Sequence, residues 1–94
     1  MSSNPQFIII DPEDNVATAI VNLKASHKMQ TDQGEITLLD DIAYGHKFAL
    51  SDIPQGQYVI KYGAQIGRAT ASISRGQHVH VHNVEDIVDE VRKG

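Results

Sequence analysis

The sequence predicts an all-β domain built from short strands that meet at tight, glycine-marked corners. One observation is that apolar residues come in runs of only a few, separated by clusters of Gly, Asp, Asn and Pro. The second is a corner pattern that recurs three times, beginning at Ala19, Ala49 and Ala69. A repeated turn between short apolar segments is typical of a small β-domain rather than of a helical one.

In each copy an aliphatic residue lies four positions after the alanine, a small residue three further, and an apolar residue three beyond that. We interpret each copy as strand, tight corner and strand, with Leu23, Ile53 and Ile73 each buried beneath its own corner. The last two copies have Gly at the turn, which permits a positive φ. The first copy has Ser26 there, which resists that conformation. Chance similarity among short turns is the alternative interpretation.

The remaining elements follow in order along the chain. Residues 7–10 are four consecutive large apolar residues and predict a buried strand, which ends at the turn-forming residues 11–15. Residues 36–39 predict a further short strand. At the end, apolar residues recur at helical spacing and Asn83 is a suitable N-cap, so we expect one short amphipathic helix over about residues 84–93. That helix would either cover its own domain or dock on a partner.

Composition limits the possible classes of function. The 94 residues are enough for a single domain, 1–94, with one core. The chain has no cysteine, which excludes disulfides and thiolate metal sites. A net charge of −4, scattered basic residues and 5% aromatic content argue against a nucleic-acid partner. No apolar run approaches the roughly 18 residues of a membrane span, and residues 7–10 are too short for a signal sequence, so we expect a cytoplasmic protein.

Three of the five histidines, His78, His80 and His82, alternate with valines near the end of the domain. In a strand the three imidazoles would line one face, because side chains alternate between faces. A row of imidazoles offers metal ligands, or proton donors and acceptors near neutral pH. We therefore treat this segment as a candidate site.

Several short segments resemble a known family. They are residues 45–50 (GHKFAL), 59–63 (VIKYG), 66–70 (IGRAT) and 76–83 (GQHVHVHN), with 14–17 (DNVA). Together they are similar to the small N-terminal module of the altronate/galactarate dehydratase family. The resemblance covers roughly residues 7–83 and implies a SAF-type β-clip of bent strands, with Ser26 departing from the family's more usual glycine.

The resemblance also implies a function. The chain would be the small subunit of a metal-dependent β-elimination lyase acting on a hydroxy acid, active only with a separate large catalytic subunit. An altronate/galactarate-type dehydratase is the first interpretation, and the small (alpha) subunit of sulfolactate sulfo-lyase is the alternative. A non-catalytic module that binds a small acid, or an adaptor, is a further alternative. The expected cofactor is a divalent metal, Fe²⁺ or Mn²⁺, held in the full complex. Homo-oligomerisation stays open.

Dehydration of a sugar acid removes a proton next to a carboxylate and expels a hydroxyl, which needs an acid–base pair or a Lewis acid. We assign His46 and His80 to proton transfer, and His78, His80 and His82 to metal binding. The alternative is that these histidines are structural and bond to neighbours or to the large subunit.

Two cations are candidates for binding the substrate carboxylate. Lys47 follows His46 at the start of a predicted strand, and Arg68 follows Gly67 and could hold a carboxylate or sulfonate with two hydrogen bonds. A solvated lysine and a surface salt bridge are the structural alternatives.

Overall fold

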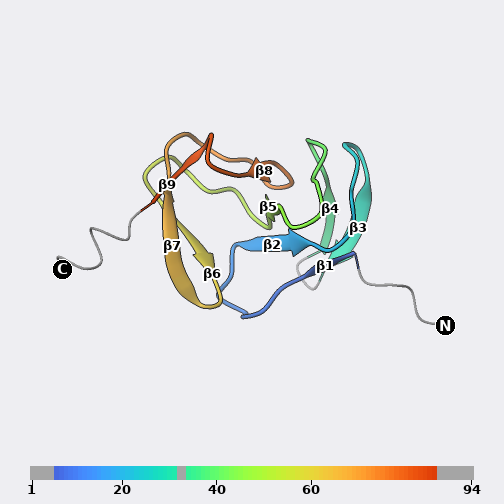
Figure 1. The fold of residues 1–94 in the computed structure, drawn as a ribbon, viewed down its shortest axis with the longest axis horizontal. Helices are drawn as coiled ribbons and strands as arrows, with labels where there is room; N and C mark the ends of the chain where they lie inside the picture. Colours follow the sequence, from blue (N-terminus) through green and yellow to red (C-terminus); the bar gives the residue numbers. More distant parts are fainter. Residues whose placement is uncertain (1–5, 32–33, 87–94) are drawn as a thin grey trace.

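The computed structural model describes residues 6–31 and 34–86, and in these ranges the chain is all-β, as predicted (Figure 1). No helix of the described residues is long and apolar enough to cross a membrane. The strands are β1 (Phe7–Ile8), β2 (Val16–Ala19), β3 (Lys28–Thr31), β4 (Gly34–Thr37), β5 (Lys47–Ala49), β6 (Tyr58–Lys61), β7 (Ala64–Ala69), β8 (His78–Val79) and β9 (Val84–Asp86).

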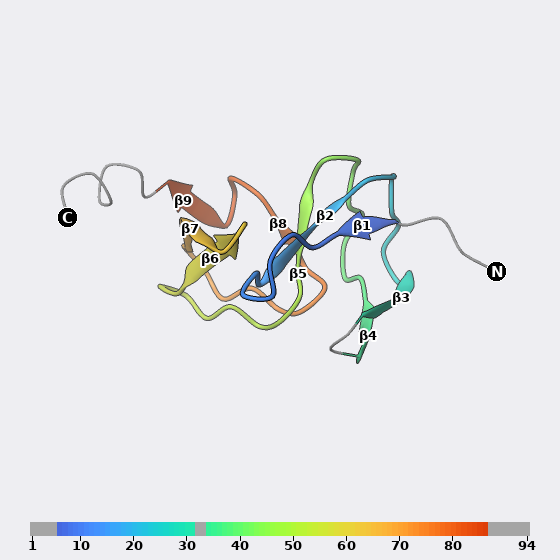
Figure 2. The ribbon, with the colours of Figure 1, turned by 90° about the horizontal axis from the view of Figure 1, so that it is seen from below.

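The strands form three small antiparallel sheets. The central sheet has the order β1-β2-β5-β8, and a β3–β4 hairpin and a β6-β7-β9 sheet complete the set. Figures 1 and 2 show the β3–β4 hairpin at one end of the molecule and the β6-β7-β9 sheet at the other, with the central strands between them. The short, bent strands agree with a SAF-type β-clip.

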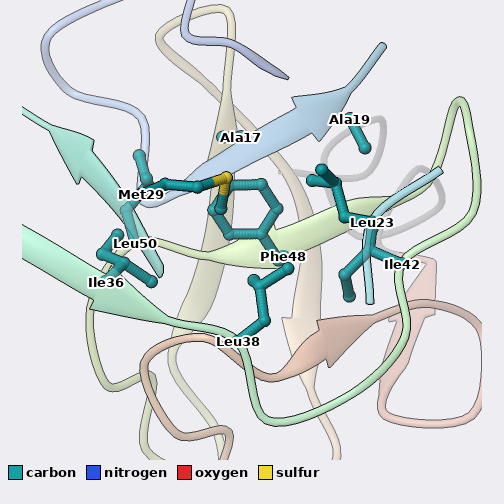
Figure 3. Packing of buried hydrophobic residues seen from close by; sticks show 9 residues of the cluster. All are labelled: Ala17, Ala19, Leu23, Met29, Ile36, Leu38, Ile42, Phe48 and Leu50. Carbon is teal, nitrogen blue, oxygen red and sulfur yellow. The ribbon is translucent and has the colours of Figure 1, made fainter. Parts of the chain in front are cut away.

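Two hydrophobic clusters lie on the two faces of the central sheet. Neighbouring residues of β5 point to opposite faces, so Phe48 enters the first cluster and Ala49 the second. Phe48 lies in the middle of the first cluster in Figure 3, and Phe7 packs against its ring edge-on at 5.6 Å. The first cluster contains Ala17, Ala19, Leu23, Met29, Ile36, Leu38, Ile42, Phe48 and Leu50. The second contains Val16, Ala49, Ile53, Val59, Ala69, Ile73 and Val79.

The corners are confirmed, and they occur in pairs. Leu23, Ile53 and Ile73 are all buried, as predicted. Ile53 and Ile73 exchange backbone hydrogen bonds of 2.7 and 2.8 Å, and Leu23 does the same with Ile42 at 2.8 Å in both directions. Ile42 marks a fourth corner that the sequence analysis missed.

A side chain from one corner also caps the backbone of its partner. In each case the Asp or Asn just before the buried aliphatic residue accepts, through its side-chain oxygen, a hydrogen bond from a backbone N–H of the opposite corner. This bond satisfies an N–H group that no strand pairing uses. The bonds run from Ala25 N to Asp41 Oδ1 (2.8 Å), from Tyr44 N to Asn22 Oδ1 (2.9 Å) and from Arg75 N to Asp52 Oδ1 (2.8 Å).

The prediction of a buried strand over residues 7–10 is wrong in its burial and its length. Only Phe7–Ile8 is strand, and Ile8, Ile9 and Ile10 are exposed. The reason is position, because β1 is an edge strand that pairs only with β2. Edge strands have one free side and less cover on their faces than central strands.

The predicted helix over residues 84–93 does not begin where expected. Val84, Glu85 and Asp86 form β9, which pairs antiparallel with β7 through Ala69, Arg68 and Gly67. Val84 packs against the second cluster, so burial against the sheet outweighs the helical spacing of its apolar neighbours. The rest of the predicted helix, residues 87–93, lies outside the described residues.

Ser26 adopts the same left-handed backbone conformation as the glycines of the other corners. Its φ is 74°, compared with 84°, 88° and 87° for Gly45, Gly56 and Gly76. A non-glycine residue costs about 1–2 kcal/mol in this conformation, so pairing with the Ile42 corner must hold Ser26 there against this strain.

Replacing Ser26 with glycine should therefore stabilise the protein. We expect Ser26→Gly to raise the free energy of unfolding by about 0.5–1 kcal/mol, because relief of strain exceeds the greater chain entropy of unfolded glycine. Gly56→Ala is the matched control, since a Cβ there meets no atom within 4 Å and only φ is affected. It should destabilise by a similar amount in urea unfolding. Equal unfolding midpoints for the two variants would contradict this explanation.

Candidate functional site

Four imidazoles lie together at one end of the central sheet. Nδ1 of His46 and Nε2 of His78 are 2.9 Å apart and share a hydrogen bond, donated by whichever ring carries the proton. The ring centroids of His46 and His80 are 4.5 Å apart, and those of His78 and His80 are 5.4 Å apart, with the planes within 19° of parallel. His82 adds a fourth ring, 5.3 Å from His78 and tilted by 34°. We call these four residues the imidazole stack.

Pairing of β5 with β8 explains why His46 belongs to this group. The two strands are antiparallel, with Lys47 opposite Val79 and Phe48 opposite His78. The residue before Lys47 therefore lies beside the residue after Val79, and these are His46 and His80. The short β5–β8 ladder thus brings together two histidines that are 34 residues apart in the sequence.

The prediction that residues 78–82 form one continuous strand is wrong. β8 ends at Val79, and residues 80–83 form a turn closed by a 3.0 Å bond from Asn83 N to His80 O. The side chain of Asn83 clamps this turn. Its Oδ1 accepts from His80 N at 2.9 Å, and its Nδ2 donates to His78 O at 2.8 Å. The turn, rather than strand alternation, brings the rings of residues 78–82 together.

Asn83 and Asp40 are positioning residues that the sequence analysis did not identify. Asn83 is buried and clamps the turn, so its assignment as a helix N-cap is wrong. Asp40 Oδ2 accepts a 2.9 Å hydrogen bond from His78 N. The sequence offered a signal for Asn83, since an Asn at the end of a short strand often bonds to nearby backbone. It offered none for Asp40, whose partner is 38 residues away.

Burial and neighbouring charges favour the neutral forms of His78 and His80 by lowering the pKa of each ring. Burial lowers the pKa of His78, and the neighbouring rings of His46, His82 and His80 lower it further, while Asp40 opposes the shift. Burial also lowers the pKa of His80, helped by His46, Lys47 and His82. Both pKa values therefore lie below the usual 6.5, and neutral imidazoles can accept protons or bind metal at pH 7.

A pocket of about 240 Å³ adjoins the stack. Lys47 and His80 contribute its polar groups, together with Glu85. Lys47 is half-buried, and in residues 6–31 and 34–86 no ion pair involves it. The pocket is lined by Lys47, Val59, Ile66, Val79, His80, Val81, Val84 and Glu85.

Arg68 is near this pocket but does not line it. Its Nη1 forms an ion pair with Glu85 Oε2 at 3.2 Å, and its guanidinium lies 5.4 Å from the centre of the Tyr58 ring. The two cations proposed to bind substrate are thus differently placed. Lys47 lines the pocket, whereas Arg68 lies beside it and forms an ion pair with Glu85.

The imidazole stack does not form a ready metal centre. Within the part of the chain that the structure describes, no group of three or more His, Asp or Glu side chains is arranged to hold a metal ion. One reason is that the facing nitrogens of His46 and His78 are hydrogen-bonded at 2.9 Å, which leaves no room between them for an ion with metal–nitrogen bonds of about 2.0–2.1 Å. Metal binding by His78, His80 and His82 stays a prediction.

Comparison with known proteins gives the family. The family model of the altronate/galactarate dehydratase SAF domain matches residues 5–87. The chain belongs to this family. The SAF domain therefore accounts for all of the described residues, including the imidazole stack and the pocket.

Relatives of the SAF domain occur in proteins of two sizes. The chain is 50% identical to altronate dehydratase of Escherichia coli over 78 residues, covering 83% of this chain and 16% of that enzyme. It is 36% identical to altronate dehydratase of Bacillus subtilis over 86 residues, covering 92% of this chain and 17% of that enzyme. It is also 38% identical to (2R)-sulfolactate sulfo-lyase subunit alpha of Chromohalobacter salexigens over 86 residues, covering 84% of this chain and 92% of that subunit. The chain thus spans about a sixth of the altronate dehydratases and nearly all of the sulfo-lyase subunit.

The stability of the SAF domain should depend on pH through the imidazole stack. The folded-state pKa values of His78 and His80 lie below 6.5, so the unfolded chain binds more protons once the pH falls below about 6.5. The free energy of unfolding should therefore decrease between about pH 7.5 and pH 5.5. Urea unfolding at these two pH values measures the change.

The matched variant is His78→Gln with His80→Gln, which removes both titrating rings. Its free energy of unfolding should change less over the same pH interval. The Asp14 carboxylate does not interfere, since burial alone would raise its pKa but the backbone N–H groups of Gly63 and its neighbours outweigh this and hold the pKa below 3.8. An unchanged pH dependence in the double variant would refute the assignment to the stack.

Removing the clamp should loosen the stack. Asn83→Ala leaves the N–H of His80 and the carbonyl of His78 without the bonds they now form, at a cost of about 2–4 kcal/mol in the free energy of unfolding. Asn22→Ala, which removes one exposed corner bond, should cost about 0.5–1 kcal/mol. Chemical denaturation compares the two, and imidazole NMR signals should shift only in the Asn83 variant. Equal costs would argue against a special role of Asn83.

Proposed function

We propose that this chain is the small SAF-type subunit of a cytoplasmic β-elimination lyase that acts on a hydroxy acid, of the altronate/galactarate dehydratase type, and works with a separate large catalytic chain. The observation that carries the proposal is the imidazole stack with the Lys47 amino group beside it at a pocket. Membership of the family supports the reaction class, and the match to nearly the whole of a relative named subunit alpha supports a small separate chain.

The chemistry requires a base for the proton next to the carboxylate and an acid for the departing hydroxyl. His46 and His80 are the proposed catalytic pair, because their rings stack with centroids 4.5 Å apart and can face one substrate together. The hydrogen bond between His46 and His78 couples their tautomers, so a proton taken by one ring changes the donor on the next.

The substrate carboxylate would pair with Lys47, which has no competing ion pair within the described residues. Arg68 would exchange its present partner Glu85 for the substrate, since a guanidinium binds a carboxylate through two parallel hydrogen bonds. Positive charge at this end also stabilises the negative charge that develops as the proton leaves.

A divalent metal, Fe²⁺ or Mn²⁺, belongs to the proposal for the assembled enzyme, where it would polarise the leaving hydroxyl. Because the rings stack rather than converge, we place most of its ligands on the large chain. His78, His80 or His82 would then contribute from the rim of a shared site.

A sulfo-lyase role is the second candidate. The match that covers 92% of (2R)-sulfolactate sulfo-lyase subunit alpha favours it, because that relative has nearly the length of this chain. The same groups suit this reaction, since elimination again begins with loss of a proton next to a carboxylate. Sulfite leaves more readily than hydroxide and needs less help from an acid.

Activity of the assembled enzyme tests the proposal. The chain should be co-expressed with a candidate large catalytic chain of this family, and elimination from altronate, galactarate and sulfolactate should be assayed. We expect His46→Ala and His80→Gln each to lower kcat by about 10²–10⁴-fold through loss of proton transfer. His27→Ala is the control, because His27 bonds to Gln6 and does not belong to the stack.

The outcomes separate the candidates. Turnover of sulfolactate alone would select the sulfo-lyase role, and turnover of none of the three acids would reject the proposal. Full activity of both stack variants would reject the assignment of His46 and His80 as catalytic residues. Circular dichroism of each variant confirms that the fold is intact.

A further inference from the structure

The pocket beside Lys47 has a character that the proposed reaction does not explain. Five of its eight lining residues are aliphatic. Val59 and Val79 are buried, whereas Ile66 is partly exposed and Val81 is 82% exposed. The exposed Val81 side chain and the aliphatic pocket beside it together form an apolar surface that no described residue covers.

A sugar acid is a poor occupant for these walls. Such acids carry a hydroxyl on nearly every carbon, and each hydroxyl placed against Val79, Val81 or Val84 would lose its water without gaining a hydrogen bond. A hydroxy acid is better served by the imidazole stack on the other side of His80. The aliphatic walls suit a branched apolar side chain, which the pocket volume of about 240 Å³ can hold.

The charges at the pocket select among apolar occupants. Glu85 is already neutralised by Arg68 at 3.2 Å, and Lys47 has no ion pair in the described part of the chain. His80 is the other polar group and adds no negative charge. The pocket therefore presents an aliphatic surface next to one uncompensated cation, and its complement is an aliphatic side chain beside a carboxylate.

We propose that this pocket docks a segment of the large catalytic chain in which an aliphatic residue is adjacent to Asp or Glu. The inference rests on the proposed function, because that function supplies the large chain. His80 lines the pocket and also stacks on His46. A partner anchored at Val81 is thereby held against the rings, and its own catalytic groups can complete the site from that side.

Methyl NMR of the full chain tests the docking chemistry with defined probes. The probes are the end-blocked dipeptides acetyl-Ile-Asp amide, acetyl-Ile-Asn amide and acetyl-Ser-Asp amide, titrated to high millimolar concentration. We expect Ile-Asp to shift the methyl signals of Ile66, Val81 and Val84. Ile-Asn should bind about two- to fivefold more weakly than Ile-Asp, because it cannot form the ion pair. Ser-Asp should bind about tenfold more weakly or worse, because it buries no aliphatic side chain.

Two variants and a control locate the effect. Val81→Ser should abolish the methyl shifts, and Lys47→Gln should remove the preference for Ile-Asp over Ile-Asn. Leu39→Ser is the matched control, since Leu39 is also an exposed aliphatic residue but does not line the pocket, and it should bind Ile-Asp normally. No shift at the pocket, or shifts that survive Val81→Ser, would overturn the proposal.

Other occupants give different results. Pocket signals that move on dilution of the free protein would assign the surface to a second copy of the chain. Contacts in the free protein between pocket methyls and residues after Asp86 would assign it to the chain's own end. Either result overturns the proposal. The failure of the reaction proposal is recognised separately, because it is read from turnover by the assembled enzyme and not from peptide shifts.

Discussion

The structure depends most on the pairing of β5 with β8. This ladder joins only two residue pairs, Lys47 with Val79 and Phe48 with His78, yet it ties together three parts of the molecule. Phe48 holds it to the first hydrophobic cluster, and Val79 holds it to the second. Beyond its end, His46 and His80 come into ring contact. A slip of one residue in this register would turn each side chain to the opposite face and dissolve the imidazole stack.

The site has two sides with different chemistry, and His80 belongs to both. On one side it stacks with His46 and His78, and burial together with repulsion from neighbouring rings lowers the pKa of His78 and of His80. On the other it borders a pocket of aliphatic side chains with a single cation, Lys47. Neutral rings suit proton transfer and aliphatic walls suit protein contact. Both proposals use the Lys47 ammonium, whose three N–H donors can serve the substrate carboxylate and a partner carboxylate together.

Much of the fold was predictable from the sequence because it rests on local signals. The repeated spacing of the corner pattern predicted that Leu23, Ile53 and Ile73 are buried. The short apolar segments excluded long helices. The fourth corner was missed because its copy begins with Leu38 where the others begin with Ala, although Ile42 and Gly45 keep the spacing. The edge position of β1 and the strand at Val84 depend on which elements pair, and no local spacing reports that.

The site was predictable in part for the same reason. The three alternating histidines and His46 were visible as candidates, but their contact depends on the β5–β8 register and on the clamp by Asn83. The state of each ring depends on burial and on its neighbours, which only the folded chain defines. Alternation of side chains in a strand suggested a flat row of imidazoles, and the turn after Val79 produced a stack.

The reciprocal corners carry a consequence for how the site is assembled. Leu23 pairs with Ile42, and Ile53 with Ile73, so each pair closes a loop of only about 20 residues, at a small entropic cost. Each half of the chain can thus form its own pair early and independently. His46 follows the first pair and His78 follows the second, so His46 joins the other three rings only after the two halves have met. Contact between these two rings therefore reports that the two halves have joined.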